Sequence, residues 1–303
     1  MSRDFSPQDA DEIRGDVSSL ATRSAAREPR NADRGDAASP RSGRAGRPRQ
    51  ESRREVPFTS GRTILYDRDR GYELRETDIR TLAELGKFRV VSTHDLIRHV
   101  YGAKQEEADR NLRALVRQGL VRKGTFDGPE QTPRELLTLT RRGLRILRAS
   151  RALPDDQAVY YGFVKPREAN HDADLYQLYQ KEAARIESGG GKNLRVILDY
   201  ELKRKINRDI ARFGTAARKE IAERHGLRVV RHKIPVPDMR IEYETRDGEM
   251  SRVNLELVTE HYRGRQVAEK VRAGFSLYTP HGEADRLRRV LDQQELTAEI
   301  LSL

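Results

Sequence analysis

Residues 104–119, KQEEADRNLRALVRQG, are expected to form one helix with an apolar face and a basic face. At about 100° per residue, one face is apolar and is formed by Ala108, Leu112 and Leu115. The opposite face carries a stripe of three arginines: Arg110, Arg113 and Arg117. We therefore expect a helix that packs its leucines on a core and presents its arginines to solvent.

The segments around this helix complete a known order of elements. Upstream, residues 76–87 show a helical apolar pattern, and Ser92 is placed to cap a second short helix. Downstream, residues 119–139 are typical of a strand, a polar tip and a return strand, and the TRRG sequence that follows opens a closing helix. Three short helices followed by a β-hairpin indicate a winged helix-turn-helix, which places one helix in the major groove of DNA.

In this interpretation the arginine stripe approaches bases or phosphates, and the wing adds three cations that contact the DNA backbone. These wing residues are Arg122, Lys123 and Arg134. Two alternatives stay open, because an arginine face on a single helix is often a solvated surface and because winged helices also dock proteins.

The composition agrees with a polyanionic partner. The 303 residues carry 59 Lys and Arg against 48 Asp and Glu, a net charge of +11. Such an excess favours binding to nucleic acid by counterion release, without distinguishing DNA from RNA or from a membrane surface. The absence of cysteine excludes disulfides, thiolate metal sites and cysteine nucleophiles. No segment approaches the roughly 20 apolar residues of a membrane span, and we expect a cytoplasmic protein with no membrane partner.

The chain divides into three predicted regions. Residues 1–56 are rich in Arg, Asp, Ala, Ser, Gly and Pro and are expected to be disordered; their end is either a DNA-tracking arm or a solvated linker. Residues 73–150 form the winged helix. Residues 166–303 alternate between helical and strand patterns, which predicts an α/β sandwich. Its expected elements include a helix over 169–187, a helix over 201–225, and strands over 229–245 and 252–260.

Three acidic residues of the second domain occupy unusual places. Glu182 projects into the apolar stripe of the first helix, where a carboxylate is costly unless it is paired or bound. Asp238 and Glu256 fall on the polar faces of two successive strands, so both carboxylates are expected on one side of a sheet. A two-residue turn at Asp247-Gly248 would put Glu256 opposite Met239, so this arrangement requires a bulge or an odd-length loop.

These motifs carry a resemblance. Pro237-Asp238, a turn and then Glu256 resemble the PD-(D/E)xK nuclease superfamily with its restriction-endonuclease-like fold. Together with the winged helix, the LTLTRRG sequence and His171-Asp172, they resemble the replication-relaxation family of plasmid and mobile-element proteins. The resemblance implies a role in plasmid or mobile-element replication, relaxation or transfer. It also implies that Asp238 and Glu256 hold Mg²⁺ or Mn²⁺ and that Glu182 is an accessory acid.

The sequence departs from the superfamily pattern two residues after Glu256. The catalytic lysine expected there is replaced by Val258, although Lys270 in the following predicted helix could substitute for it. Three hypotheses follow: a DNA-binding protein with a degenerate nuclease domain, a metal-dependent nuclease or nickase, and a transcriptional regulator whose second domain forms a homodimer or senses a signal.

Overall fold

The computed structural model describes residues 61–128, 132–259, 262–279, 284–293, 296, 298 and 300–302. The segment 1–56, for which the sequence predicts disorder, lies outside these residues. No helix in the described part of the chain combines the length and the apolar character needed to cross a membrane.

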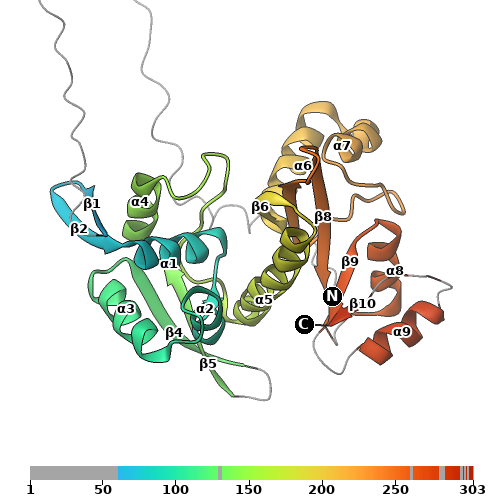
Figure 1. Cartoon of the computed structure of the whole chain (residues 1–303). Coiled ribbons are helices and arrows are strands. Elements are labelled where there is room, and N and C mark those ends of the chain that lie inside the picture. The colour runs from blue at the N-terminus through green and yellow to red at the C-terminus, as the bar shows by residue number, and fades with distance from the viewer. Residues whose placement is uncertain are drawn as a thin grey trace, which may run out of the picture. The chain divides into compact units, whose positions relative to one another are not determined.

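The N-terminal half is a winged helix preceded by a hairpin (Figure 1). Its elements are β1 (Arg62–Asp67), β2 (Arg70–Arg75), α1 (Glu76–Lys87), β3 (Val91–Ser92), α2 (Thr93–Val100), α3 (Gln105–Arg117), β4 (Val121–Asp127), β5 (Pro133–Leu139) and α4 (Arg141–Ser150). Strands β3, β5 and β4 pair in that order, so β4 and β5 form the wing. The predicted helices, wing and closing helix are confirmed, whereas the β1–β2 hairpin has no clear signal in the sequence.

Two short sequence signals fix the ends of helices in this domain. Ser92 accepts a hydrogen bond from the Asp95 backbone at 3.3 Å and caps α2. Thr140 caps α4 by accepting from the Gly143 backbone at 3.0 Å. A Cβ at Gly143 would lie 2.0 Å from the Leu120 carbonyl oxygen, so a larger residue would push α4 away from the wing.

The second domain is an α/β sandwich around a five-stranded sheet. Its elements are α5 (Pro166–Ser188), β6 (Lys192–Leu198), α6 (Asp199–Phe213), η3 (Thr215–Ala217), α7 (Arg218–Arg224), β7 (Met239–Glu244), β8 (Met250–Leu257), α8 (Gly264–Arg272), β9 (Ser276–Thr279), α9 (Ala284–Asp292) and β10 (Ile300–Ser302). The strand order is β10-β9-β8-β7-β6, antiparallel from β6 to β8 and parallel from β8 to β10. Helix α5 lies on one side of the sheet and α8 and α9 on the other (Figure 1). This is the predicted fold class, a winged helix followed by a restriction-endonuclease-like sandwich.

Two predicted elements differ from the observed ones. The helix expected over 201–225 is interrupted at Gly214, whose φ of +81° favours glycine and ends α6. The strand expected from 229 onward begins only at Met239, and the preceding segment contains an isolated bridge between Val230 and Lys233. Asp238 therefore lies immediately before β7 and not within a strand.

The register of β7 and β8 confirms the predicted odd-length loop. Met239 pairs with Leu255, and Glu244 pairs with Met250, which leaves residues 245–249 as the connection. Because side chains alternate along a strand, this register places the polar positions of both strands on one face.

The winged helix and the second domain share one hydrophobic core. Phe88 of the winged helix packs edge-on against Tyr176 of α5, with ring centroids 5.1 Å apart. The segment between α4 and α5 is also packed, because the Gln157 side chain donates to the Val196 carbonyl at 2.9 Å and accepts from the Val196 N–H at 3.0 Å.

Candidate nucleic-acid interface

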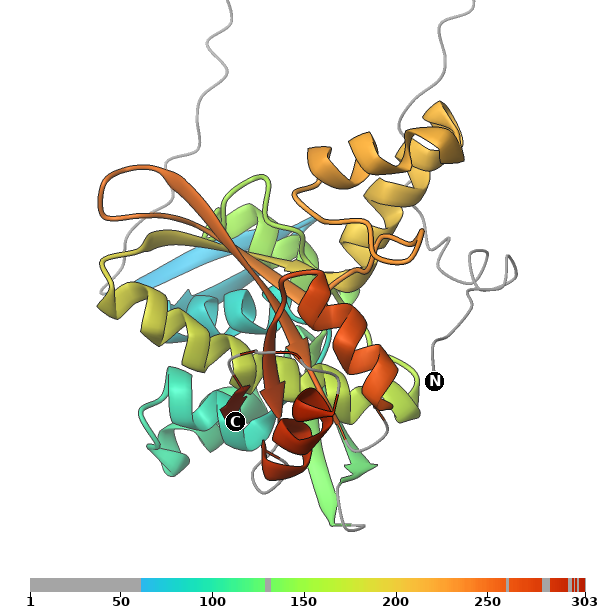
Figure 2. The same cartoon turned by 90° about the vertical axis from the view of Figure 1, so that its right-hand side faces the viewer.

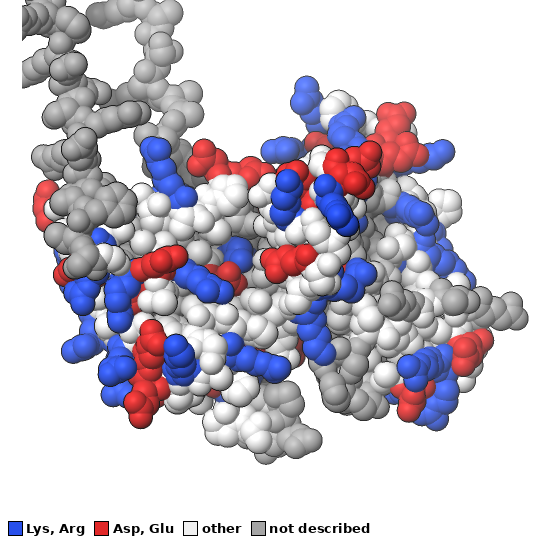
Figure 3. Space-filling view, in the orientation of Figure 1, with Lys and Arg blue, Asp and Glu red and all other residues white. Residues whose placement is uncertain are grey.

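The arginine stripe of α3 is exposed as the sequence predicts. The apolar face is buried in the core, while the other face presents Arg110, Arg113 and Arg117 to solvent. None of these arginines makes a hydrogen bond or an ion pair with another residue that the structure describes. Figure 3 shows Lys and Arg side chains gathered over the region of α3.

The wing presents its cations on two different faces. Val121 packs into the core that also holds Leu115 of α3, and Lys123 lies on the same face of β4. Lys123 is exposed and pairs with Glu135 at 2.5 Å. Arg122 points to the opposite face, where its guanidinium carbon lies 5.6 Å from the centre of the Phe163 ring. Lys123 therefore extends the α3 surface, and Arg122 does not.

Arg134 belongs to the contact between the winged helix and α5. Its side chain is 17% exposed and pairs with Asp174 at 2.7 Å and with Asp95 at 3.5 Å. Asp95 is buried and also accepts from Gln177 at 2.8 Å. The guanidinium is thus engaged within the protein, so we do not include Arg134 in the interface.

Replacing Arg134 with glutamine is expected to reduce the free energy of unfolding by about 3 kcal/mol, because it leaves the buried Asp95 carboxylate without its cation. Chemical denaturation measures this loss. DNA affinity of the folded variant should stay within about twofold of the parent, since Arg134 lies outside the interface and is neutralised by Asp174 and Asp95. A large loss of DNA affinity with unchanged stability would show that Arg134 belongs to the DNA interface.

In the second domain, Asp238, Glu256 and Lys270 converge. The Lys270 Nζ atom lies 2.6 Å from Oε1 of Glu256, and the Asp238 N–H donates to the other Glu256 carboxylate oxygen at 3.2 Å. Asp238 accepts from the Leu257 N–H at 2.9 Å. Lys270 of α8 thus supplies the positive charge beside Glu256. Val258, which occupies the position of the expected lysine, is instead buried in the apolar cluster under α8 and α9.

Two further side chains complete this centre. His171 of α5 places Nε2 3.5 Å from Asp238 and Nδ1 3.6 Å from Asp172. Tyr262 donates its hydroxyl to Glu256 at 2.8 Å. The signal in the sequence for His171 is the His171-Asp172 pair at the start of a predicted helix, and the signal for Tyr262 is the run of polar residues that follows the strand of Glu256.

Burial and mutual charge set the protonation of this centre. Burial and the neighbouring Asp238 raise the pKa of Glu256 to about 7 despite Lys270 and Tyr262. Burial alone would raise the pKa of Asp238, but the hydrogen bond and charge of His171, with Lys270 and the Leu257 N–H, lower it below its usual range. Burial likewise opposes the charged form of His171, yet Asp172 and Asp238 raise its pKa well above the usual range. The centre is a network of ion pairs.

Glu182 lies elsewhere on α5. It is eleven residues beyond His171, about 16 Å along the helix axis, and is fully buried. Its carboxylate accepts from the Tyr278 hydroxyl at 2.6 Å and from Arg185 Nε at 3.0 Å. These partners satisfy a buried carboxylate, and the structure does not bring it to Asp238.

The arrangement around Glu256 does not fit a divalent cation. One of its oxygens accepts from Lys270 and Tyr262, the other from the Asp238 backbone, and the side chain is fully buried. Mg²⁺ requires near-octahedral oxygen ligands that keep several waters. Among the described residues, no group of three or more His, Asp and Glu side chains could hold a metal ion. The Lys270 ammonium is the cation beside Glu256.

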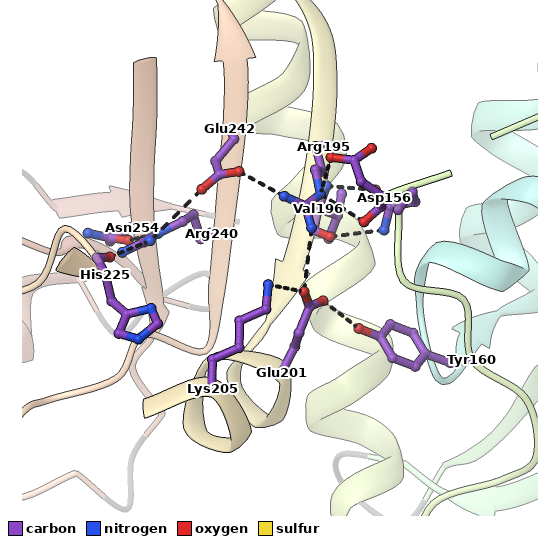
Figure 4. Close-up of polar contacts among 11 residues, drawn as sticks. Asp156, Tyr160, Arg195, Val196, Glu201, Lys205, His225, Arg240, Glu242 and Asn254 are labelled. Carbon is purple, nitrogen blue, oxygen red and sulfur yellow. Dashed lines mark hydrogen bonds and ion pairs between the residues drawn. The ribbon is translucent and has the colours of Figure 1, made fainter. Parts of the chain in front are cut away.

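A second polar network covers the other part of the sheet (Figure 4). Arg240 is buried and donates to the His225 carbonyl at 2.7 Å and to Asn254 at 2.8 Å. Burial, followed by the charge of Arg252, lowers the pKa of Arg240 to about 10. Arg195 pairs with Glu242 of β7 at 3.1 Å and with Glu201 of α6 at 3.5 Å. These contacts attach the α6–α7 segment to the sheet.

The comparisons with known proteins give little. No family model and no curated protein matches this chain. The crystal structure of Bacillus subtilis PadR in complex with operator DNA is similar in part, with 16% sequence identity, coverage of 50% of this chain and 77% of that chain, and a TM-score of 0.23. Similarity at this level establishes neither a shared fold nor a shared function.

Proposed function

We propose that this chain is a DNA-binding protein that contacts duplex DNA through α3 and the adjoining face of the wing. The observation that carries the proposal is the stripe of Arg110, Arg113 and Arg117, exposed and unpaired among the described residues, on the helix that a winged helix inserts into the major groove. Lys123, whose ammonium group pairs with Glu135, lies on the adjoining face of the wing. Arginine is suited to this role because its planar fork binds phosphates and guanine edges.

Duplex DNA is favoured over a protein partner by the chemistry of the α3 face. Protein interfaces need buried apolar or aromatic anchors, and the apolar residue that α3 exposes is Val116, at 38%. Duplex DNA is also favoured over duplex RNA, whose major groove is too deep and narrow for side chains to read. A helix of about 10 Å diameter fits the roughly 12 Å major groove of B-DNA.

For the second domain we favour a structural role on a nuclease-like scaffold over cleavage. Lys270 neutralises Glu256 directly, and both Glu256 oxygens are engaged by protein groups. The role in plasmid or mobile-element replication, relaxation or transfer, which the resemblance of the motifs implies, is part of the proposal as its biological setting.

The proposal is tested by titrating a labelled duplex with the full chain and following fluorescence anisotropy at several salt concentrations. If the three arginines and Lys123 contact phosphates, the logarithm of the association constant should fall with the logarithm of salt with a slope of about −3 or steeper. The duplex should remain intact when Mg²⁺ or Mn²⁺ is added. No anisotropy change at low salt would contradict DNA binding, and metal-dependent nicking that Asp238→Ala abolishes would establish the nuclease alternative.

A further inference from the structure

The insertion between β6 and β7 holds a large share of the positive charge of the chain. Residues 199–233 contain eleven Lys and Arg against five Asp and Glu, an excess of six within a chain of net charge +11. The segment folds into α6, η3 and α7, which stand beyond one end of the sheet in both views (Figures 1 and 2). The α3 surface does not account for this charge.

The unpaired cations of α6 form a stripe. Arg204, Arg208 and Arg212 are spaced four residues apart, about 6 Å along the helix axis. All three are exposed, and none has an ion pair with another described residue. The other cations of the same helix differ, because Lys203 pairs with Asp199 at 2.7 Å and Lys205 with Glu201 at 2.6 Å. The arginines of α6 therefore resemble those of α3, because they are exposed and without an ion pair to the described residues.

An exposed aromatic ring ends the stripe. Phe213 is 44% exposed, and the guanidinium carbons of Arg212 and Arg224 lie 5.0 and 4.9 Å from the centre of its ring. Cation–π contacts of this kind hold the guanidinium groups at the surface. Aromatic rings beside arginines are also the groups on which sugars and bases of nucleic acids stack.

The insertion is held rigidly. Ile206 of α6 packs with Ile221 of α7 and with Phe275, which directly precedes β9, in a separate apolar cluster. Arg240 fixes the end of α7 through the His225 and Gly226 carbonyls, at 2.7 and 3.3 Å. A preorganised surface loses less conformational entropy on binding than a flexible arm does.

From these observations we infer that α6 forms a second DNA-binding surface, in which Arg204, Arg208 and Arg212 contact backbone phosphates and Phe213 packs against the same strand. This surface binds without reading sequence, because its contacts are charge and apolar packing on the sugar-phosphate backbone. It is independent of the α3 interface, so the full chain has two places at which it holds DNA.

The test compares two variants that remove the same charge from the same helix. Arg204→Ala with Arg208→Ala removes unpaired cations, whereas Lys203→Ala with Lys205→Ala removes cations that are already paired. Both are made in the full chain that also carries Arg110→Ala, Arg113→Ala and Arg117→Ala, so that residual duplex binding reports on α6. Circular dichroism verifies that each variant is folded, and Phe213→Leu tests the ring.

We expect the chain with the α3 substitutions to keep weak, salt-dependent binding. The arginine pair should then lower that residual affinity at least about tenfold and the salt slope by about 2, while the lysine pair leaves both nearly unchanged. Phe213→Leu should lower the residual affinity severalfold. Complete loss of binding on substitution of α3 alone, or equal effects of the two pairs, would overturn the inference and leave the α3 interface in place. If the α3 substitutions change nothing and the α6 pair removes binding, the proposed function of α3 fails and the α6 surface stands.

Discussion

Replacing Arg110, Arg113 and Arg117 together with alanine is expected to lower the affinity for duplex DNA at least about a hundredfold. Each arginine that contacts a phosphate or a base edge contributes through charge and hydrogen bonds, and the salt slope should fall by about 3 when all three are lost. The fold should be unaffected, because all three side chains are exposed and alanine favours helix. Anisotropy titration over a range of salt measures both quantities.

The matched control removes three arginines that are exposed but paired elsewhere in the chain. Arg62 pairs with Glu73, Arg265 with Glu269, and Arg288 with Asp285. Their combined replacement with alanine changes the net charge by the same amount and should alter affinity only slightly, through long-range attraction. If the control loses as much affinity as the α3 variant, binding follows total charge and α3 is not the interface.

Replacing Lys270 with methionine is expected to reduce the free energy of unfolding by about 1 to 2 kcal/mol at about pH 8, because Glu256 with a pKa of about 7 can take up a proton at a cost of about 1.4 kcal/mol when its cation is lost. The substitution leaves Glu256, which is fully buried, without the ammonium group 2.6 Å away. Methionine keeps the length of the side chain, so the loss reports mainly on charge. Chemical denaturation with and without the substitution measures it.

The pH dependence of this loss is fixed by the pKa of Glu256. That pKa is about 7 in the folded chain, above its ordinary 4.5, so the favourable contribution of the protonated carboxyl is complete below about pH 4.5 and is lost as the pH rises through 7. The cost of Lys270→Met should therefore be smaller near pH 5, by up to about 1.4 kcal/mol, because Glu256 is mostly protonated there.

Glu256→Gln in the same chain supplies the control for the Lys270 substitution. A neutral amide needs no counterion, so the double variant should be more stable than the sum of the two single losses predicts. Additive losses, or a loss from Lys270→Met that does not depend on pH, would show that Lys270 stabilises the domain by packing and not by neutralising Glu256.

The features that the sequence predicts most directly are those that one periodic pattern determines. The two faces of residues 104–119, the Thr140 cap and the glycine at 143 are local signals, and each has the predicted place in the winged helix. The alternation in β7 and β8 also indicated that a bulge or an odd-length loop must bring Asp238 beside Glu256, and the structure has the loop. These features depend on residues close in sequence.

The parts that the sequence did not indicate depend on long-range packing. Arg134 and Lys123 are both cations of the wing, and the sequence does not separate them. In the structure, Arg134 lies on the face of the wing that packs against α5, where it pairs with Asp174. Glu182 is buried as predicted, yet its partner Tyr278 comes from a strand 96 residues away. The pairing that separates the lysines of α6 from its arginines is a property of the folded helix.

The most direct test of DNA binding by α3 is photocrosslinking from single positions to labelled duplex DNA. A photoreactive amino acid replaces Arg113 on the exposed face of α3 in one variant and Met250, which is 73% exposed on β8, in another. The proposed interface predicts a crosslink from position 113 that competes with unlabelled duplex and weakens with salt, and little from position 250. Crosslinking from position 250 with none from position 113 would contradict it.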